Sequence, residues 1–509
     1  MSSINEEPIG STESFETEMG DPVREERENP SLSMPASKEQ KGDVLSFQAD
    51  PRRWIALVII LSGSFMAGMD GFIVNIAIPS IQKGLDASFA SMQFVVAGYS
   101  LTYAMLLITG GRLGDLYGRK RLFMVGLTGF VFASGLGGLA PNIAILVVAR
   151  LLQGAAAGLL FPQILALIQV TFREKERDLA FGWYGVTIGL SQAGGLVLGS
   201  LLLAANLFGL VWRPLFLINL PIGIVALVLA GPFVPEARVP STQKLDLGGA
   251  SLVTLGLAFL IFPLIQGREM NWPWWIFLCL GLAVLLLIGF FYYERFIDAR
   301  GGSPLLNQSL FQNLPFIRGL LMVILFFGAP GAFLLIVTFY LQLGLGLSAF
   351  FAGLITLPFA LGVFLASFVA APIKSKLGKH VLTTGALVMI VGILVCMVTI
   401  AWINSASGGA GLLPGLFLIG FGFGLVLSPL VNILLSSIAL AHAGAASGMI
   451  GTCIQIGLSL GVALIGIVFF GLLAKQMTYA TAFTWSLASI LVPLVLTIGL
   501  VFSLPSTRR

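Results

Sequence analysis

Long apolar stretches dominate the chain, and each is long enough to cross a bilayer. A helix of about 20 apolar residues spans the roughly 30 Å of hydrocarbon in a membrane. The connections between the stretches are short, so no soluble domain fits between them. The pattern predicts an all-α polytopic membrane protein with 14 transmembrane helices. The windows lie near residues 55–79, 92–110, 122–140, 143–170, 182–205, 214–233, 247–265, 274–293, 317–341, 349–371, 381–402, 412–435, 444–473 and 482–503.

The basic residues of the loops predict the orientation. Lys and Arg concentrate on the cytoplasmic side of a membrane. With the N-terminus inside, the inner loops and flanks hold 19 basic residues, and the outer loops hold only Lys83, Arg213, Arg268 and Lys475. We therefore expect a multi-pass protein of the cell membrane, plasma or inner, with both termini in the cytoplasm.

The first 50 residues differ from the rest of the chain. They hold 12 acidic and four basic residues and few aromatic ones. A segment of this composition buries too little apolar surface to fold. Residues 1–50 are therefore predicted to be a disordered cytoplasmic tail, and residues 504–509 a short second one. The remaining 24 basic and 11 acidic residues fit a loop bias and not a nucleic-acid surface.

Composition also limits the chemistry. Hydrophobic residues make up 57% of the 509 and charged residues only 10%, whereas a soluble domain carries about 25% charged residues. The two histidines stand apart in loops and the three cysteines lie in apolar runs, so we expect no disulfide, metal site or bound cofactor. These residues are His380, His442, Cys279, Cys396 and Cys453.

A dense charged hairpin, Gly111–Arg121, separates two apolar runs. Its glycines permit close approach of helices, and Asp115 can pair with Arg112 or Arg119 at helical spacing. The hairpin resembles the signature loop between the second and third helices of the major facilitator superfamily, a family of transporters. The resemblance implies a gating loop, whose residues here are Gly111, Arg112, Asp115, Gly118, Arg119 and Lys120.

A weak internal repeat supports a two-bundle architecture. A shift of 260 residues aligns residues 371–380 with the hairpin, and Gly378 falls on Gly118. The copy is degenerate, because Ser375 stands in place of the aspartate. The resemblance implies a major facilitator fold of two six-helix bundles plus two inserted helices, with the substrate site between the bundles. The predicted N-terminal bundle, inserted helices with their linkers, and C-terminal bundle cover residues 52–233, 234–300 and 301–503.

Two ionisable residues stand out inside the apolar windows, where charged groups are functional candidates. At 1.5 Å per helical residue, Asp70 lies about 13 Å and Arg150 about 12 Å below the outer surface. The matched depth predicts that both face a central cavity, as a direct pair or through substrate, water or a neighbouring amide. Burial disfavours a charged carboxylate and a nearby guanidinium favours it, so movement of Arg150 would let Asp70 load and release a proton. The alternative is a static clamp between helices.

Both residues lie in segments that resemble motifs of the 14-helix drug/proton antiporters, a family of multidrug exporters. Asp70 stands in the acidic motif of the first predicted helix, residues 55–79. Arg150 and Gln153 stand in the proton-coupling motif of the fourth, residues 143–170. Residues 212–223 match a further family stretch, whereas Leu196 replaces the proline of the antiporter motif in helix 5. The resemblance implies proton-coupled efflux driven by the proton motive force, with Asp70 and Arg150 as the coupling residues.

The side chains expected in the cavity indicate the class of substrate. One buried acid among many apolar groups suits lipophilic small molecules or drugs, including cationic ones, for which aromatic rings supply cation–π contacts. The alternative is a carrier of the same fold for a single metabolite or lipid-like substrate. An enzyme is disfavoured, because the spans lack clustered His, Asp, Ser or Cys. The candidate cavity residues are Asn75, Tyr99, Gln153, Phe161, Gln192, Phe333, Asn432 and Gln455.

Overall fold

The computed structural model describes residues 51–503, except residues 88, 237–244, 268, 269, 271, 301, 303, 307 and 403–408. The predicted tails, residues 1–50 and 504–509, lie outside the described residues. Within the described part, 14 helices are long and apolar enough to span a membrane. The predicted all-α polytopic fold is therefore confirmed.

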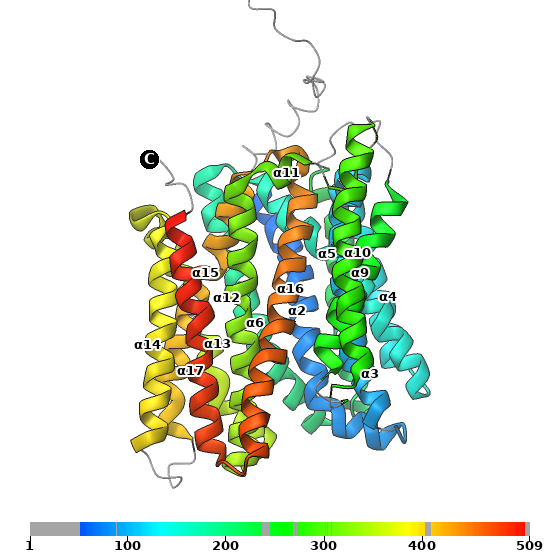
Figure 1. Cartoon of the computed structure of the whole chain (residues 1–509). Coiled ribbons are helices and arrows are strands. Elements are labelled where there is room, and N and C mark those ends of the chain that lie inside the picture. Colours follow the sequence, from blue (N-terminus) through cyan, green and yellow to red (C-terminus); the bar gives the residue numbers. More distant parts are fainter. Residues whose placement is uncertain are drawn as a thin grey trace, which may run out of the picture.

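The long helices follow the apolar windows closely, and α7 and α8 together form one span. The helices are numbered in chain order, and Figure 1 labels most of them. Their bounds are α2 Arg53–Gly84, α3 Phe89–Tyr117, α4 Arg119–Gly138, α5 Ile143–Thr171, α6 Glu174–Ala205, α7 Pro214–Leu217, α8 Asn219–Phe233, α9 Leu247–Gln266, α10 Trp274–Ala299, α11 Gln308–Gln312, α12 Leu314–Phe339, α13 Ala349–Leu377, α14 His380–Trp402, α15 Leu413–Ser436, α16 Ala443–Ala474 and α17 Tyr479–Ser503.

The helices pack as two bundles that lie side by side (Figure 1). In the N-terminal bundle, α2 packs on α6 and α8, while α5 packs on α3 and α4. In the C-terminal bundle, α12 packs on α16 and α17, while α15 packs on α13 and α14. Of the inserted pair, α9 packs against α3 of one bundle and α16 of the other, and α10 packs on α9. The bundles meet mainly through α3 with α16 and through α6 with α13.

Local sequence signals begin and end several of these helices. The side chains of Asn142 and Asn313 accept hydrogen bonds from the amides of Ile145 and Phe316, at 3.0 and 3.1 Å, and so cap α5 and α12. Gly118 and Gly378, which the internal repeat aligns, have φ of 106° and 57° and link α3 to α4 and α13 to α14. This left-handed backbone favours glycine, so the repeat preserves the turn although it loses the aspartate.

Large apolar side chains cover the outside of the bundles. Val58, Phe132 and Trp402 are 69%, 67% and 86% exposed. The inserted α10 is the least enclosed span, with 17% of its most apolar window buried. In water such a surface would be unfavourable, whereas lipid tails solvate it. The exposed surface and the span lengths together identify the protein as embedded in a bilayer.

Glycines let neighbouring helices touch backbone to backbone. A Cβ on Gly420 of α15 would lie 1.9 Å from the carbonyl oxygen of Phe359 on α13. A Cβ on Gly461 of α16 would lie 2.0 Å from the carbonyl oxygen of Gly328 on α12. Association of helices in lipid depends on such contacts, because no hydrophobic effect drives it there.

Replacing Gly420 by alanine should therefore separate α13 from α15. We expect Gly420→Ala to destabilise the protein by about 1–3 kcal/mol, the usual cost of overpacking, and to lower the melting temperature of the purified protein in detergent. Gly471→Ala is the matched control, because a Cβ there meets nothing within 4 Å. Equal melting temperatures for the two variants would show that the α13–α15 contact is not tight.

Candidate functional site

Asp70 and Arg150 form a direct ion pair inside the N-terminal bundle. Asp70 lies on α2 and Arg150 on α5, and the residues are 0% and 2% exposed. The Nη1 group of Arg150 donates to Oδ2 of Asp70. The matched depths allowed either a direct pair or a link through substrate, water or an amide, and the structure shows the direct pair.

Three further polar side chains surround the pair. Gln153 donates to Asp70 Oδ1 at 2.8 Å and accepts from Arg150 Nη1 at 2.8 Å. Asn219 of α8 donates to the same Asp70 oxygen at 3.3 Å. Ser134 of α4 accepts from both amides, at 2.7 Å from Gln153 and 3.3 Å from Asn219. These five side chains, the coupling network, join four helices of the N-terminal bundle.

A tyrosine ring covers the guanidinium. Arg150 lies over the ring of Tyr99 with its Cζ 4.4 Å from the ring centroid, a favourable cation–π geometry. The Nε group of Arg150 donates to the carbonyl of Val95 at 3.0 Å. The hydroxyl of Tyr99 donates to the carbonyl of Ala67 at 3.1 Å, which fixes the ring on α2.

The pair is enclosed and does not face an open cavity, contrary to the expectation from depth alone. Its partners come from four helices of one bundle, so they surround both charges. Loss of one partner from such a pair costs about 3–5 kcal/mol, because the other charge stays buried without compensation. Since a guanidinium cannot lose its proton, the change of charge available to the pair is protonation of Asp70.

A row of aromatic rings leads from the coupling network to the boundary between the bundles. Tyr99 stacks on Tyr103 at 6.1 Å, and Tyr103 meets Phe161 edge-on at 5.9 Å. Phe161 meets Tyr184 at 6.5 Å, and its ring lies 3.2 Å from where a Cβ on Gly451 of α16 would stand. The rings therefore form a continuous chain of contacts from Arg150 to the C-terminal bundle.

The predicted gating loop joins the two bundles. Asp115 pairs with Arg119 at 2.9 Å and accepts hydrogen bonds from the amides of Gly444 and Ala445, at 3.0 and 2.8 Å. These amides lie in the first turn of α16, where the positive end of the helix dipole favours an anion. Arg119 donates in turn to the carbonyl of Leu440. We call this contact between the bundles, on the predicted cytoplasmic side, the first latch.

Close packing holds the first latch in place. A Cβ on Gly111 would lie 2.2 Å from the carbonyl oxygen of Gly444, so α3 and α16 touch there without side chains between them. Gly118 provides the turn, while Lys120 donates to the carbonyl of Gly231 at 2.5 Å. Arg112 is 5% exposed on α3. Gly111, Asp115 and Arg119 therefore lie at the contact with the C-terminal bundle, whereas Lys120 contacts α8 of its own bundle.

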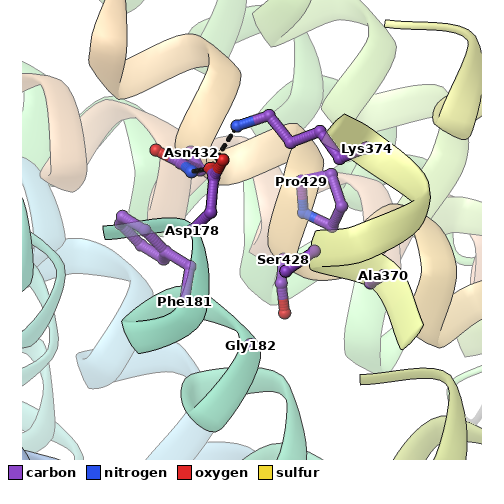
Figure 2. A pocket seen from close by; sticks show the side chains of 9 residues that line it. Asp178, Phe181, Gly182, Ala370, Lys374, Ser428, Pro429 and Asn432 are labelled. Atoms are coloured by element: carbon purple, nitrogen blue, oxygen red, sulfur yellow. Dashed lines mark hydrogen bonds and ion pairs between the residues drawn. The ribbon is translucent and has the colours of Figure 1, made fainter. Parts of the chain in front are cut away.

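A second polar contact joins the bundles at a different place. Figure 2 shows Asp178 of α6 with Lys374 of α13 and Asn432 of α15 converging on its carboxylate. Both donate to the same oxygen, Asp178 Oδ1. The three residues, the second latch, line a small crevice together with Phe181, Gly182, Ala370, Ala371, Ser428 and Pro429.

The second latch corresponds to the first through the internal repeat. Lys374 lies on α13 just before Gly378, in the segment that aligns with the gating loop. The first loop presents an acid to the other bundle, whereas the second presents a base to Asp178. Sequence reasoning missed Asp178, and expected Asn432 in the substrate cavity. Asn432 is 2% exposed and belongs to the second latch.

The other candidate cavity residues are distributed over several environments. Tyr99 and Gln153 belong to the coupling network and its cover. Phe161 is half-buried in the aromatic row, whereas Phe333 is 1% exposed and packs on Phe359 at 6.2 Å. Half-buried positions on α6 and α16 are occupied by Gln192 and Gln455. The side chain of Asn75 lies outside the described residues.

Ser134 and Asn219 are the side chains of the network that sequence reasoning missed. Asn219 stands in the stretch 212–223, which had been noted only as a family pattern. Ser134 is a lone hydroxyl in an apolar run and is 0% exposed. A buried polar residue in a span needs a hydrogen-bond partner. Its presence in an apolar window was therefore the signal that could have identified it.

Removing the charge of Asp70 should leave the Arg150 guanidinium buried without a counter-ion. We expect Asp70→Asn to destabilise the purified protein by about 3–5 kcal/mol at neutral pH. The double variant Asp70→Asn, Arg150→Gln should recover part of that loss. Thermal unfolding in lipid nanodiscs measures both. Strictly additive losses would contradict a direct interaction between the two charges.

Reversing one charge of the second latch should separate the bundles there. Spin labels at Leu179 and Leu377, exposed near the latch, report the separation by pulsed dipolar spectroscopy in a background without native cysteines. We expect Asp178→Lys to populate longer distances, and the added change Lys374→Asp to restore the short ones. An unchanged distribution in Asp178→Lys would show that this ion pair does not hold the bundles together.

The fold has counterparts among solved structures. The proton:xylose symporter XylE bound to a bromodeoxyglucose aligns with a TM-score of 0.62 at 16% identity, covering 92% of this chain and 97% of that chain. The human organic anion transporter MFSD10 aligns with a TM-score of 0.60, also at 16% identity, over 88% of this chain and 100% of that chain. At this identity the likeness shows the fold alone.

Comparison of sequences identifies relatives that are more similar to this chain than these solved structures are. It is 40% identical over 432 residues to a probable actinorhodin transporter of Streptomyces coelicolor, covering 84% of this chain and 74% of that protein. It is 33% identical to a tetracenomycin C resistance and export protein of Streptomyces glaucescens, covering 82% and 76%. The multidrug resistance protein Stp of Mycobacterium tuberculosis is 30% identical, covering 81% and 75%. Residues 60–462 match the family model of the Major Facilitator Superfamily, and the chain therefore belongs to this superfamily of membrane transporters.

Proposed function

We propose that the protein exports lipophilic small molecules, antibiotics or other drugs among them, in exchange for protons across the cell membrane. Transport proceeds by alternating access, and the proton motive force drives it with no bound cofactor. Both termini lie in the cytoplasm, so the two latches close the cytoplasmic side. The observation that carries the proposal is the enclosed Asp70–Arg150 pair, a protonatable group and a permanent charge in contact within a membrane-embedded bundle.

Relatives of this chain support export as the direction of transport. Their names include a tetracenomycin C resistance and export protein, a puromycin resistance protein and a cephamycin export protein. The last two are 35% and 34% identical to this chain over most of its length. We infer that this chain likewise moves a small molecule out of the cell.

Proton binding changes the interactions of Arg150. When a proton binds Asp70, the carboxylate loses its charge and the salt bridge becomes at most a neutral hydrogen bond. Arg150 then keeps the Gln153 oxygen, the Val95 carbonyl and the face of Tyr99 as partners. Because a buried guanidinium without a counter-ion is unfavourable, the protonated state favours a conformation in which Arg150 moves. Release of the proton restores the ion pair.

The aromatic row gives the movement a route to the substrate path. Tyr99 touches Arg150 at one end, and Phe161 meets the C-terminal bundle at the other. Aromatic faces bind lipophilic and cationic compounds, so a substrate beside Phe161 senses the state of the pair. The two latches then open or close the cytoplasmic side as the bundles rock.

One proton supplies enough free energy for this exchange. A pH difference of one unit is worth about 1.4 kcal/mol per proton. A membrane potential of 100 mV adds about 2.3 kcal/mol per charge. For a neutral substrate the two together support a gradient of several hundredfold, because about 1.4 kcal/mol corresponds to a factor of ten at 25 °C. Exchange of a monovalent cation for one proton moves no net charge, so the pH difference alone then supports a gradient of about tenfold.

Dye efflux tests the proposal. In energised cells or everted vesicles at matched expression, we expect the wild type to export ethidium or a similar lipophilic dye, and an uncoupler to stop it. Asp70→Asn should abolish the efflux, because the site can no longer change its charge. Asp86→Asn is the matched control, since Asp86 is an exposed carboxylate just beyond the end of the same helix.

Three outcomes would contradict the proposal. Equal efflux by the wild type and Asp70→Asn would make the ion pair a structural clamp. Absence of efflux by the wild type across several dyes would favour a carrier with one narrow metabolite or lipid-like substrate. Efflux that resists the uncoupler would exclude the proton motive force as the driving gradient.

A further inference from the structure

A second pair of carboxylates lies at one end of the inserted pair of helices. Asp246 caps α9, and Glu294 lies in the last turns of α10. The Oδ1 atom of Asp246 accepts from the amide of Gly249 at 3.0 Å and from the hydroxyl of Tyr293 at 3.2 Å. The Oε2 atom of Glu294 accepts from the amide of Leu306 at 2.9 Å. One oxygen of each carboxylate is therefore satisfied.

The two remaining oxygens lie close together. Asp246 Oδ2 and Glu294 Oε1 are buried, and neither has a hydrogen-bond partner among the described residues. Both lie against Gly249, at 2.6 and 2.2 Å from the point where a Cβ would stand. Only a glycine leaves room for them.

Two ionised carboxylates in this arrangement would repel each other. When two carboxylates share a site, one of them holds a proton that the other accepts as a hydrogen bond. The environments decide which one. Glu294 is 4% exposed and belongs to the buried interior, whereas Asp246 is half-buried, closer to solvent, and has two donors that stabilise its charge. The proton therefore belongs on Glu294.

One cation faces the pair from the N-terminal bundle. The guanidinium of Arg112 on α3 is near enough to interact electrostatically with Glu294. Arg112 also interacts with Asp115 of the first latch. The carboxylate pair thus lies at a junction of the inserted helices, the linker at Leu306 and the gating loop.

We propose that Asp246 and Glu294 form a second protonation site, in which the Oε1–H group of Glu294 donates to Oδ2 of Asp246. The site binds one proton and is separate from the coupling network. It keeps the inserted helices attached to the linker through Leu306. The proposal does not depend on the identity of the transported substrate, because the proton is held in the resting protein.

The pH dependence of stability tests the proposal in the purified full-length chain. In the unfolded chain both carboxyl groups are ionised at neutral pH, so the folded protein binds one proton more than the unfolded chain. Stability then falls as pH rises. We expect the wild-type Tm to fall between about pH 5 and about pH 8 more steeply than that of Glu294→Gln or Asp246→Asn.

The variants separate the proton from other effects. Asn still caps α9, so Asp246→Asn keeps the local structure. Asp298→Asn is the matched control, because Asp298 is an exposed carboxylate on the same helix, and it should keep the wild-type slope. Equal slopes in the wild type and both pair variants would overturn the proposal.

Infrared spectroscopy gives a second readout that needs no change in stability. The folded wild type at neutral pH should show the C=O stretch of a protonated carboxyl group, shifted in D₂O and lost in Glu294→Gln. If that variant fails to fold, loss of the band in Asp246→Asn serves instead. Absence of the band in the wild type, or a Tm at alkaline pH that Na⁺ or Mg²⁺ restores only in the wild type, would contradict a bound proton.

Discussion

A carboxylate and a guanidinium held in contact inside a lipid-embedded bundle are the constraint on which the rest of this structure depends. Each charge alone is costly at that depth, so α2 and α5 must keep Asp70 and Arg150 in register. The surrounding amides and hydroxyl are placed to satisfy the pair, and they come from α4, α5 and α8. Only one member of the pair can change its charge, which is why a proton can act on it.

The coupling network lies in one bundle, whereas the motion that transport requires takes place between bundles. The structure bridges this gap with packed aromatic rings, from Tyr99 to Phe161, and with two polar latches. The latches use charge in opposite senses, since Asp115 faces the amides of α16 and Lys374 faces Asp178. The ion pair of the second latch is partly exposed, and such pairs are individually weak. In the proposed cycle this contact is exchanged, while the buried Asp70–Arg150 pair supplies the larger energetic difference between the two states.

Sequence predicted the fold well because a bilayer restricts it strongly. The window at 214–233 coincides with the span Pro214–Phe233. The fixed rise of a helix also placed Asp70 and Arg150 at one depth. Depth does not give the rotation of a helix, however, so neither the enclosure of the pair nor the role of Ser134 could be predicted. The contact of Asn432 with Asp178 could not be predicted either, because the pairing of α6 with α15 is decided by packing between bundles.

The account depends on protons moving through Asp70 when substrate moves, and proton movement can be measured directly. Purified protein in liposomes with a trapped pH indicator, and no imposed gradient other than that of the substrate, reports it. The account predicts that a gradient of transported dye drives protons in the opposite direction, and that Asp70→Asn shows no such movement while still binding the dye. Dye transport by the wild type without any change in internal pH would contradict it.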